Sequence, residues 1–237
     1  MHLQDDNARA QYIQDMFGRI SRRYDLMNRL MTFGQDMRWR RFVVEKASIN
    51  AGDRVLDLAT GTGDIAFTAR QAEPSLTVVG ADFSLPMMQV GKARPLGGDV
   101  LWCQADALSL PFPSASFDAV VSGYLLRNLV DLARGLREQV RVVRPGGAVV
   151  ALDTTPPPHN LFRPFIEFHL RYVIPLMGKV IAGVPDAYEY LPSSTQAFRT
   201  PEELAELMRD AGLVNVGYRT FMFDTMAVHW GYRPAAG

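Results

Sequence analysis

A loop rich in glycine holds the residues with the clearest potential for chemistry in this chain. Residues 55–64 read Val-Leu-Asp-Leu-Ala-Thr-Gly-Thr-Gly-Asp, an apolar run that leads into the loop and then into a helical pattern. Glycine allows the backbone to turn tightly and to approach a ligand closely, so Gly61, Thr62 and Gly63 are candidate ligand-binding residues. By itself the loop also satisfies the dinucleotide fingerprint with alanine in its last place, and a turn without any ligand is a further alternative.

Acidic residues at the ends of successive predicted strands distinguish between ligands. Asp57 precedes the first glycine by four residues, where it would repel a pyrophosphate but suits a ligand with an ammonium group, such as S-adenosylmethionine. Asp82 can accept hydrogen bonds from ribose hydroxyls, which serves any nucleoside. Asp106 suits an adenine amino group, for which a nicotinamide enzyme needs no acid. We therefore predict S-adenosylmethionine, with S-adenosylhomocysteine as its product, bound by Asp57, Gly61, Thr62, Gly63, Asp82, Phe83, Asp106 and Ala107.

Strand and helix patterns alternate through the middle of the chain. Strand-like runs lie at 54–59, 77–81, 100–104, 117–122 and 148–153, and helical patterns lie at 64–72, 86–93 and 129–143. This alternation implies right-handed crossovers and an α/β fold with a doubly wound parallel sheet. The continuous apolar strands fit a sheet that is covered on both faces.

The two ends of the chain add helices and a hairpin to this sheet. Residues 1–48 predict an N-terminal helical cap that breaks near Gly34, and residues 156–199 predict a helical cover for the substrate, inserted after the fifth strand. Thr200 and Glu203 form a capping box for a further helix. Runs at 214–220 and 225–230 predict two antiparallel strands joined at 221–224. We expect one domain over residues 1–237 with a mostly parallel, seven-stranded, Rossmann-like sheet of the class I methyltransferase type.

Charge and composition exclude several function classes. The 25 basic and 25 acidic residues leave a formal net charge of zero, so there is no global electrostatic case for nucleic acid. The single cysteine, Cys103, excludes an intrachain disulfide, and the four histidines lack the spacing of a zinc site, so we expect no metal. Residues 1–10 do not resemble a signal peptide, and we find no run of about 18 uncharged apolar residues. We therefore expect a cytoplasmic protein.

Two segments indicate a surface with a partner. Residues 19–46 hold eight basic side chains against three acidic ones, which is typical either of a solvated helical face or of peripheral contact with anionic lipid at the inner face of a membrane. Residues 161–181 carry apolar side chains on most faces of a helix. A buried cover helix, a homodimer contact, a channel for a prenyl tail and a membrane-facing surface are all open interpretations of that segment.

Outside the cofactor residues, the chain resembles the ubiquinone/menaquinone biosynthesis C-methyltransferases over nearly its whole length. The most specific matches are Tyr24-Asp25-Leu26-Met27-Asn28 and Leu126-Arg127-Asn128. Further matches are Met16-Phe17, Trp39-Arg40, Tyr190-Leu191, Ser194, Phe198, Ala211-Gly212 and His229-Trp230-Gly231-Tyr232-Arg233. The resemblance implies C-methylation of a prenylated quinol in menaquinone or ubiquinone biosynthesis, most directly of demethylmenaquinol to menaquinol.

Three positions depart from the pattern of that family. Leu125 stands where glycine is usual and narrows the space beside the substrate head group. Asp153 stands where glutamate is common, which shortens the reach of the carboxylate, and Arg199 replaces a frequent proline. We expect none of the three to touch the predicted nucleoside site.

The resemblance also implies catalytic roles for residues near the reacting ring. A phenolic hydroxyl has a pKa on the order of 10 and must lose or share its proton before the ring carbon becomes a good nucleophile. Arg127 would stabilise the developing phenolate, because a guanidinium stays protonated and cannot act as a neutral base. Asn128 would orient the hydroxyl or a water, and Tyr24 would fix the ring or relay a proton. Asp153 and His229 are the two candidate bases.

Less specific interpretations of these residues, and other functions, are still open at this point. Arg127 could instead pair near a strand end, Tyr24 could be a core residue, and His229 could be a buried, hydrogen-bonded histidine. A class I methyltransferase for another small molecule, such as a secondary metabolite, would share every cofactor residue. A nicotinamide oxidoreductase would share the glycine loop and Asp82. A non-catalytic scaffold is disfavoured, because every inferred catalytic position is filled.

Overall fold

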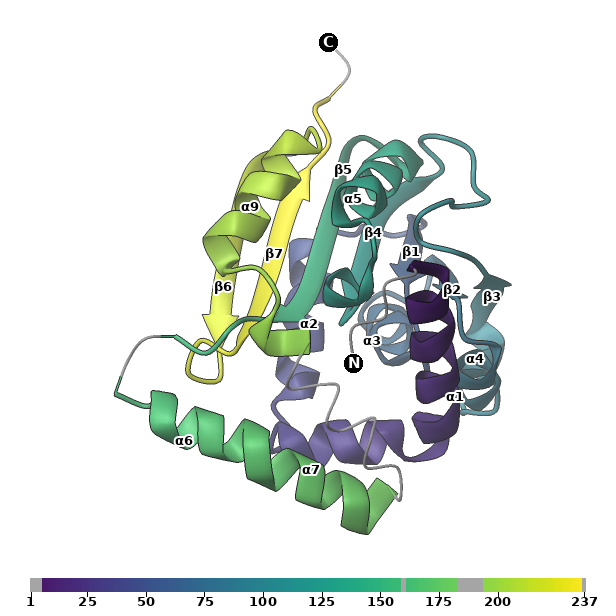
Figure 1. Cartoon of the computed structure of the whole chain (residues 1–237). Coiled ribbons are helices and arrows are strands. Elements are labelled where there is room, and N and C mark those ends of the chain that lie inside the picture. The colour runs from purple at the N-terminus through teal and green to yellow at the C-terminus, as the bar shows by residue number, and fades with distance from the viewer. Residues whose placement is uncertain (1–5, 159–160, 183–193, 236–237) are drawn as a thin grey trace.

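Seven strands form one sheet in the computed structural model, which describes residues 6–158, 161–182 and 194–235 (Figure 1). They are β1 (Arg54–Leu58), β2 (Thr77–Asp82), β3 (Val100–Gln104), β4 (Phe117–Gly123), β5 (Val143–Thr154), β6 (Val214–Phe221) and β7 (Met226–Tyr232). Their order in the sheet is β3-β2-β1-β4-β5-β7-β6. Strands β1 to β5 pair in parallel, and β7 runs antiparallel to both β5 and β6. The predicted mostly parallel, seven-stranded sheet is confirmed.

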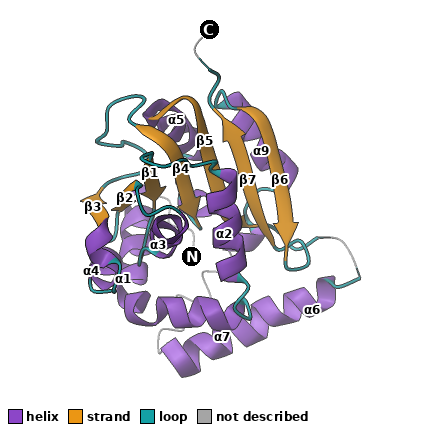
Figure 2. Cartoon of the chain, turned by 180° about the vertical axis from the view of Figure 1, so that it is seen from behind, coloured by secondary structure: helices purple, strands orange, loops and turns teal. Residues whose placement is uncertain are grey.

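Helices cover both faces of the sheet. As Figure 1 and Figure 2 show, α2 (Asp36–Lys46) and α3 (Asp64–Ala72) lie on one face, and α5 (Leu132–Val142) and α9 (Pro201–Asp210) lie on the other. α4 (Leu85–Lys92) packs beside β2 and β3 and against α1 (Asp6–Met31). Two short 3-10 helices, η1 (Gly97–Asp99) and η2 (Leu126–Asn128), precede β3 and follow β4.

Alternating apolar side chains along the central strands explain the two covered faces. Val121 and Val150 join the core under α2 and α3, where Trp39 is also buried. Val120 and Val149 point the other way and join the core under α5 and α9. All four valines are exposed by 1% or less. Because both faces are apolar, each central strand reads as a continuous apolar run in the sequence.

The cap and the cover lie against each other at one end of the sheet (Figure 1). The described part of the cover contains one long helix, here called the cover helix, which consists of α6 (Arg163–Phe168), η3 (His169–Val173), α7 (Ile174–Met177) and η4 (Gly178–Ala182). The segments η3 and η4 have π-helical hydrogen bonding. Met16, Ile20 and Met27 of α1 form an apolar cluster with Ile174 of the cover helix. The predicted break in the cap occurs beside Gly34, whose φ is +73°.

Two elements begin three or more residues away from the position expected from the sequence. The helix expected from residue 129 begins at Leu132, because Asp131 caps it by accepting a hydrogen bond from the Arg134 amide at 2.9 Å. Strand β5 begins at Val143 rather than at 148, and residues 144–147 form an irregularity in its pairing with β4. Glycine is required within it, since a Cβ atom at Gly147 would lie 2.4 Å from the Asp118 carbonyl oxygen.

The C-terminal expectations agree with the structure. The capping box is present: the Glu203 amide donates to the Thr200 hydroxyl at 3.3 Å, and the Thr200 amide donates to the Glu203 carboxylate at 2.9 Å. Strands β6 and β7 form the predicted antiparallel hairpin. The Tyr190-Leu191 match lies outside the described residues. Within the described ranges, none of the helices combines the length and the apolar composition needed to cross a bilayer.

Candidate functional site

Seven of the eight predicted cofactor residues line one pocket of about 470 Å³, here called the cofactor pocket, which includes the carboxyl ends of β1 and β2. The glycine loop forms one wall, and its Gly61 and Gly63 have φ values of +57° and +89°, which favour glycine. A Cβ atom at Gly63 would lie 2.8 Å from the Phe67 ring, so glycine is needed for the tight turn. The residues that line the pocket are Asp57, Gly61, Thr62, Asp82, Phe83, Asp106 and Ala107, whereas Gly63 only shapes the turn.

Asp57 fits a positively charged ligand. It is 1% exposed, and its Oδ2 atom accepts hydrogen bonds from the Thr60 hydroxyl at 2.7 Å and the Ala66 amide at 2.9 Å. Its Oδ1 atom has no hydrogen-bond partner among the described residues. Burial raises the pKa of Asp57 to about 7, because the ionised carboxylate is poorly solvated. A cation in the pocket would stabilise this carboxylate, which suits the sulfonium and ammonium groups of S-adenosylmethionine.

Asp82 and Asp106 order the backbone around the same pocket. Asp82 accepts hydrogen bonds from the amides of Gly61 and Ser84, both at 2.7 Å. Asp106 accepts one from the Leu108 amide at 2.9 Å. Burial raises the pKa of Asp82, and its amide donors act against that rise. Each carboxylate oxygen can accept more than one hydrogen bond, so both residues can hold the loop and still accept from a nucleoside.

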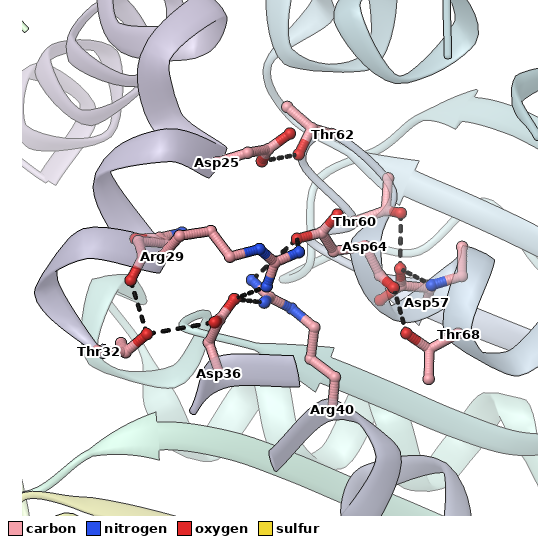
Figure 3. Close-up of polar contacts among 12 residues, drawn as sticks. Asp25, Arg29, Thr32, Asp36, Arg40, Asp57, Thr60, Thr62, Asp64 and Thr68 are labelled. Carbon is pink, nitrogen blue, oxygen red and sulfur yellow. Dashed lines mark hydrogen bonds and ion pairs between the residues drawn. The ribbon is translucent and has the colours of Figure 1, made fainter. Parts of the chain in front are cut away.

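A network of ion pairs joins the N-terminal cap to the glycine loop (Figure 3). Asp64, the first residue of α3, lies 3.2 Å from the Arg40 guanidinium and 2.6 Å from that of Arg94. Asp36 forms ion pairs with both Arg40 and Arg29. Arg40, Asp36 and Asp64 are nearly inaccessible to solvent. We call Arg29, Asp36, Arg40, Asp64 and Arg94 the cap network.

Asp25 extends this network to the loop itself. The Thr62 hydroxyl donates to Asp25 Oδ1 at 2.6 Å (Figure 3). Arg94 lies 3.1 Å from Asp25 Oδ2. Burial raises the pKa of Asp25, and the charge of Asp64 adds to the rise. Since Asp25 follows Tyr24 on α1, the contact to Thr62 also sets the position of Tyr24 relative to the cofactor pocket.

Arg127 and Asp153 form a buried ion pair near this pocket. Arg127 Nη1 lies 2.5 Å from Asp153 Oδ1, and the two side chains are only 4% and 2% exposed. The Arg127 amide also donates to Asp153 Oδ2 at 3.2 Å. Burial acts to lower the pKa of Arg127, but pairing with Asp153 outweighs it and the pKa is raised. Arg127 is therefore a fixed cation with Asp153 as its counterion.

Two tyrosines lie where the cofactor pocket adjoins a smaller cavity of about 100 Å³, here called the second cavity. Tyr24 of α1 and Tyr124, which follows β4, line both spaces, and Arg127 lines the second cavity. The Arg127 guanidinium lies 5.0 Å from the centre of the Tyr124 ring. The Asn128 side chain lines the cofactor pocket and donates to the Tyr124 carbonyl at 2.8 Å. Burial raises the pKa of both tyrosines, so both hydroxyls are neutral at pH 7.

The two predicted bases, Asp153 and His229, lie outside the linings of both spaces. His229 is 1% exposed, its Nε2 atom lies 2.9 Å from the Pro201 carbonyl oxygen, and its ring centre lies 5.3 Å from that of Tyr218. Burial lowers the pKa of His229. Neither residue lines the cofactor pocket or the second cavity, and the Asp153 carboxylate is occupied by Arg127 and the Thr154 amide. Their roles as bases therefore stay predictions.

Several residues at the site were not singled out in the sequence. The sequence could have indicated Arg40, because it belongs to the Trp39-Arg40 match with the resembling family. It could also have indicated Tyr124, which stands directly before the unusual Leu125. Leu125 lines the cofactor pocket, so the expectation that it does not touch this site is wrong. Arg94 and His169 carried no local signal, because their contacts form only in the folded chain.

A comparison with protein families agrees with this geometry. Residues 5–233 match the family model described as the ubiE/COQ5 methyltransferase family. The chain belongs to this family. The resemblance predicted from the sequence is thereby confirmed, together with the S-adenosylmethionine-dependent chemistry that it implied.

Individual members of the ubiE/COQ5 family are similar over nearly the whole chain. A protein of Desulfotalea psychrophila named ubiquinone/menaquinone biosynthesis C-methyltransferase UbiE is 50% identical over 221 residues, which are 93% of this chain and 90% of that protein. A protein of Thermus thermophilus named demethylmenaquinone methyltransferase is 45% identical over 92% of this chain and 100% of its own length.

Solved structures with low sequence identity share the fold. A SAM-dependent methyltransferase from Thermotoga maritima has a TM-score of 0.67 at 18% identity and covers 93% of this chain, with 99% of its own chain aligned. The cyclase SpnF has a TM-score of 0.70 at 16% identity and covers 96% of this chain and 97% of its own. The fold is therefore the class I methyltransferase fold, as predicted, and the cyclase shows that this fold does not determine the reaction.

The raised pKa of Asp57 leads to a prediction about cofactor binding. A bound cation favours the ionised carboxylate, so the pKa of Asp57 should fall on binding and S-adenosylmethionine affinity should rise with pH through about 7. At pH 6.5 we expect wild-type protein to release a proton on binding that Asp57→Asn does not release. Calorimetry in two buffers with different ionisation enthalpies measures the difference. Equal release by both proteins would contradict the linkage.

Proposed function

We propose that this chain transfers the methyl group of S-adenosylmethionine to a ring carbon of a prenylated quinol, with demethylmenaquinol as substrate and menaquinol as product. The observation that carries the proposal is the position of Tyr24 and Tyr124 between the cofactor pocket and a cavity that holds the buried Arg127 cation. An aromatic ring between these tyrosines would have the methyl donor on one side and the cation on the other. Relatives named demethylmenaquinone methyltransferase favour the naphthoquinol ring.

The chain provides position and charge for this reaction. S-adenosylmethionine, when bound, supplies a methyl group on a positively charged sulfur that is a good leaving group. Asp57 offers a buried carboxylate to that charge, and Asp82 holds the glycine loop through the Gly61 amide. Alignment of donor and acceptor within one closed site accounts for much of the catalysis that a single displacement step requires.

Arg127 would favour ionisation of the quinol. Burial raises the pKa of Tyr24 and Tyr124, and the positive charge of Arg127 acts against the rise at both hydroxyls. A quinol hydroxyl in the same position would experience the same charge, which stabilises a phenolate and makes the adjacent ring carbon more nucleophilic. Asn128 would act by holding the backbone of Tyr124 in place.

The outer face of the cover helix supports membrane contact. Phe165, Phe168, Tyr172, Leu176 and Val180 recur every three or four residues, so they lie on one side of the helix, and each is more than half exposed. A row of exposed apolar side chains of this size usually contacts a partner. We call these five residues the outer face.

We infer that the partner of the outer face is the inner leaflet of a membrane, with the protein at its cytoplasmic side. The prenyl tail of the substrate dissolves in lipid, and each buried methylene contributes about 0.8 kcal/mol to such partitioning. Arg171 and Lys179 are exposed on the same helix and suit anionic headgroups. The excess of basic residues over positions 19–46 gives weaker support for membrane contact. Arg29 and Arg40 in that segment are already paired with Asp36 in the cap network.

An assay with purified protein tests the proposed reaction. Incubation with S-adenosylmethionine and a demethylmenaquinol under reducing conditions should yield the methylated quinol by mass spectrometry, and the oxidised quinone should not react, because its ring is electrophilic. A demethylated ubiquinone precursor and a panel of phenolic secondary metabolites serve as competing substrates. Preference for one of these would overturn the substrate, and no methyl transfer to any of them would overturn the function.

Removal of the Arg127 charge should abolish most turnover. Loss of a group that stabilises the developing charge costs about 10²–10³-fold in kcat, so we expect that fall for Arg127→Ala while S-adenosylhomocysteine affinity is unchanged. The single variant leaves Asp153 buried and unpaired, which destabilises the fold. The double variant Arg127→Ala/Asp153→Ala removes this complication and should remain inactive. Arg137→Ala, at an exposed position of α5, is the matched control. Normal turnover by the double variant would refute the role of Arg127.

Polar substitutions on the outer face should weaken membrane binding. We expect Phe165→Ser/Leu176→Ser to lose most co-sedimentation with phosphatidylglycerol vesicles, because it removes two side chains that are 74% and 61% exposed. Leu101→Ser, at a 60% exposed position of the edge strand β3, is the matched control and should bind like wild type. If light scattering instead finds a dimer that the double variant converts to a monomer, the outer face is a subunit contact and the membrane proposal is wrong.

A further inference from the structure

The second cavity contains polar atoms that the proposed mechanism has not used. Asn28 Nδ2, Arg127 Nε and His169 Nε2 are all buried, and none has a partner among the described residues with the geometry of a full hydrogen bond. Asn28 is nevertheless close enough to the Tyr24 hydroxyl to lower the pKa of Tyr24 by a hydrogen bond. All three residues line this one cavity. Buried polar atoms in native proteins are almost always hydrogen-bonded, because an unmet donor or acceptor costs its full desolvation penalty. Atoms of this kind around one cavity indicate that a polar group of a ligand is their partner.

The three atoms differ in whether they donate or accept hydrogen bonds. The Asn28 amide and the Arg127 guanidinium present N–H groups, so both donate hydrogen bonds. A neutral imidazole can accept a proton at the nitrogen that carries none. Two donors and one acceptor around a hydroxyl are the set needed to hold a phenol oxygen while its proton leaves.

His169 comes from a different element than the other two residues. It begins η3 in the cover helix, whereas Asn28 lies on α1 and Arg127 lies in η2 after β4. The His169 ring centre lies 6.3 Å from that of Phe33, and Leu170 and Ile174 beside it line the same cavity. The cover helix therefore contributes a titratable group to the site in addition to apolar surface.

We propose that His169 is the catalytic base that removes the proton from the quinol hydroxyl, and that Asn28 and Arg127 hold the resulting oxyanion. This inference rests on the proposed function. The O–H proton moves to His169 Nε2, and the ring carbon next to the oxygen forms a bond to the methyl group. The bond between that methyl group and sulfur breaks, and its electron pair stays on sulfur. The proton on the methylated carbon then leaves to water, and His169 returns its proton to the oxygen. One proton is released in total.

The charges around the second cavity suit this role. The titratable groups that line it besides His169 are Tyr24 from α1, and Tyr124 and Arg127 from the segment after β4. Asp153 of β5 is paired with Arg127. Burial lowers the pKa of His169, because the charged imidazolium is poorly solvated. The imidazole is therefore neutral at pH 7 and able to accept a proton.

Kinetics of His169→Gln test the proposal. General base catalysis contributes roughly 10²–10⁴-fold to a rate, so kcat should fall by that factor, while the KM of the quinol and S-adenosylhomocysteine affinity change little. The wild-type kcat should rise with pH to a plateau as His169 loses its proton, and the variant should lack this plateau. Glu167→Gln is the matched control, since Glu167 lies on the same helix, pairs with Arg163 and lines neither cavity. A variant with wild-type kcat and pH profile would overturn the role of His169.

Binding of an inert phenol gives a readout that needs no turnover. An acidic phenol analogue of the quinol, whose own pKa is close to that of a free imidazole at about 6.5, is bound together with S-adenosylhomocysteine. It should show phenolate absorption with wild type and less with His169→Gln. If the variant does not fold, carbon-13 NMR of histidine-labelled wild type replaces it, and one imidazole should become protonated when the analogue binds. Unchanged histidine signals would refute the proposal. Failure of wild type to methylate any quinol would instead refute the proposed function, which separates the two outcomes.

Discussion

The site depends on buried ion pairs that join the N-terminal cap to the first turn of α3. Asp36 and Asp64 both pair with Arg40, which is almost inaccessible to solvent. The removal of such charges from water costs several kcal/mol per ion, and only complete pairing offsets that cost. The network therefore permits one arrangement of α1 and α2 relative to the glycine loop. Because Tyr24 and Asp25 lie on α1, the same arrangement fixes the reacting end of the site and one wall of the cofactor pocket.

The site consists of two adjoining spaces, one with a buried carboxylate and the other with a buried cation. Asp57 is a buried carboxylate with a free oxygen atom, and it faces the space for a cationic donor. Arg127 is a buried cation with an unused N–H group, and it lines the second cavity, where the proposed reaction would place an oxygen that becomes anionic. Tyr24 and Tyr124 keep their protons and lie between them. In the proposed reaction, this separation would let each charge act on its own ligand. The sulfonium and the phenolate would then come together only at the reacting carbon atoms.

The sequence predicted the sheet, the glycine loop and most of the cofactor pocket, because these depend on local patterns. Apolar runs, glycines and the acids that follow each strand appear in order along the chain, and parallel topology brings their ends together. Contacts between distant segments had no such signal. Arg94 reaches Asp64 across 30 positions of the chain, and His169 reaches the second cavity from the cover helix. His229 had the right residue type for a base, but its position in β7 directs it toward α9, where Pro201 accepts its hydrogen bond.

The place of β7 in the sheet has a consequence for how the protein is made. β7 is the last strand in the sequence, yet it lies between β5 and β6. During synthesis from the N-terminus, the apolar edge of β5 must therefore wait unpaired until residues 226–232 leave the ribosome. An open strand edge of this kind is a template for pairing with other chains. The nascent chain is thus open to aggregation at this edge until β7 has emerged and paired with β5. The Arg233 guanidinium, which follows β7, then donates to the Val143 carbonyl at 2.7 Å.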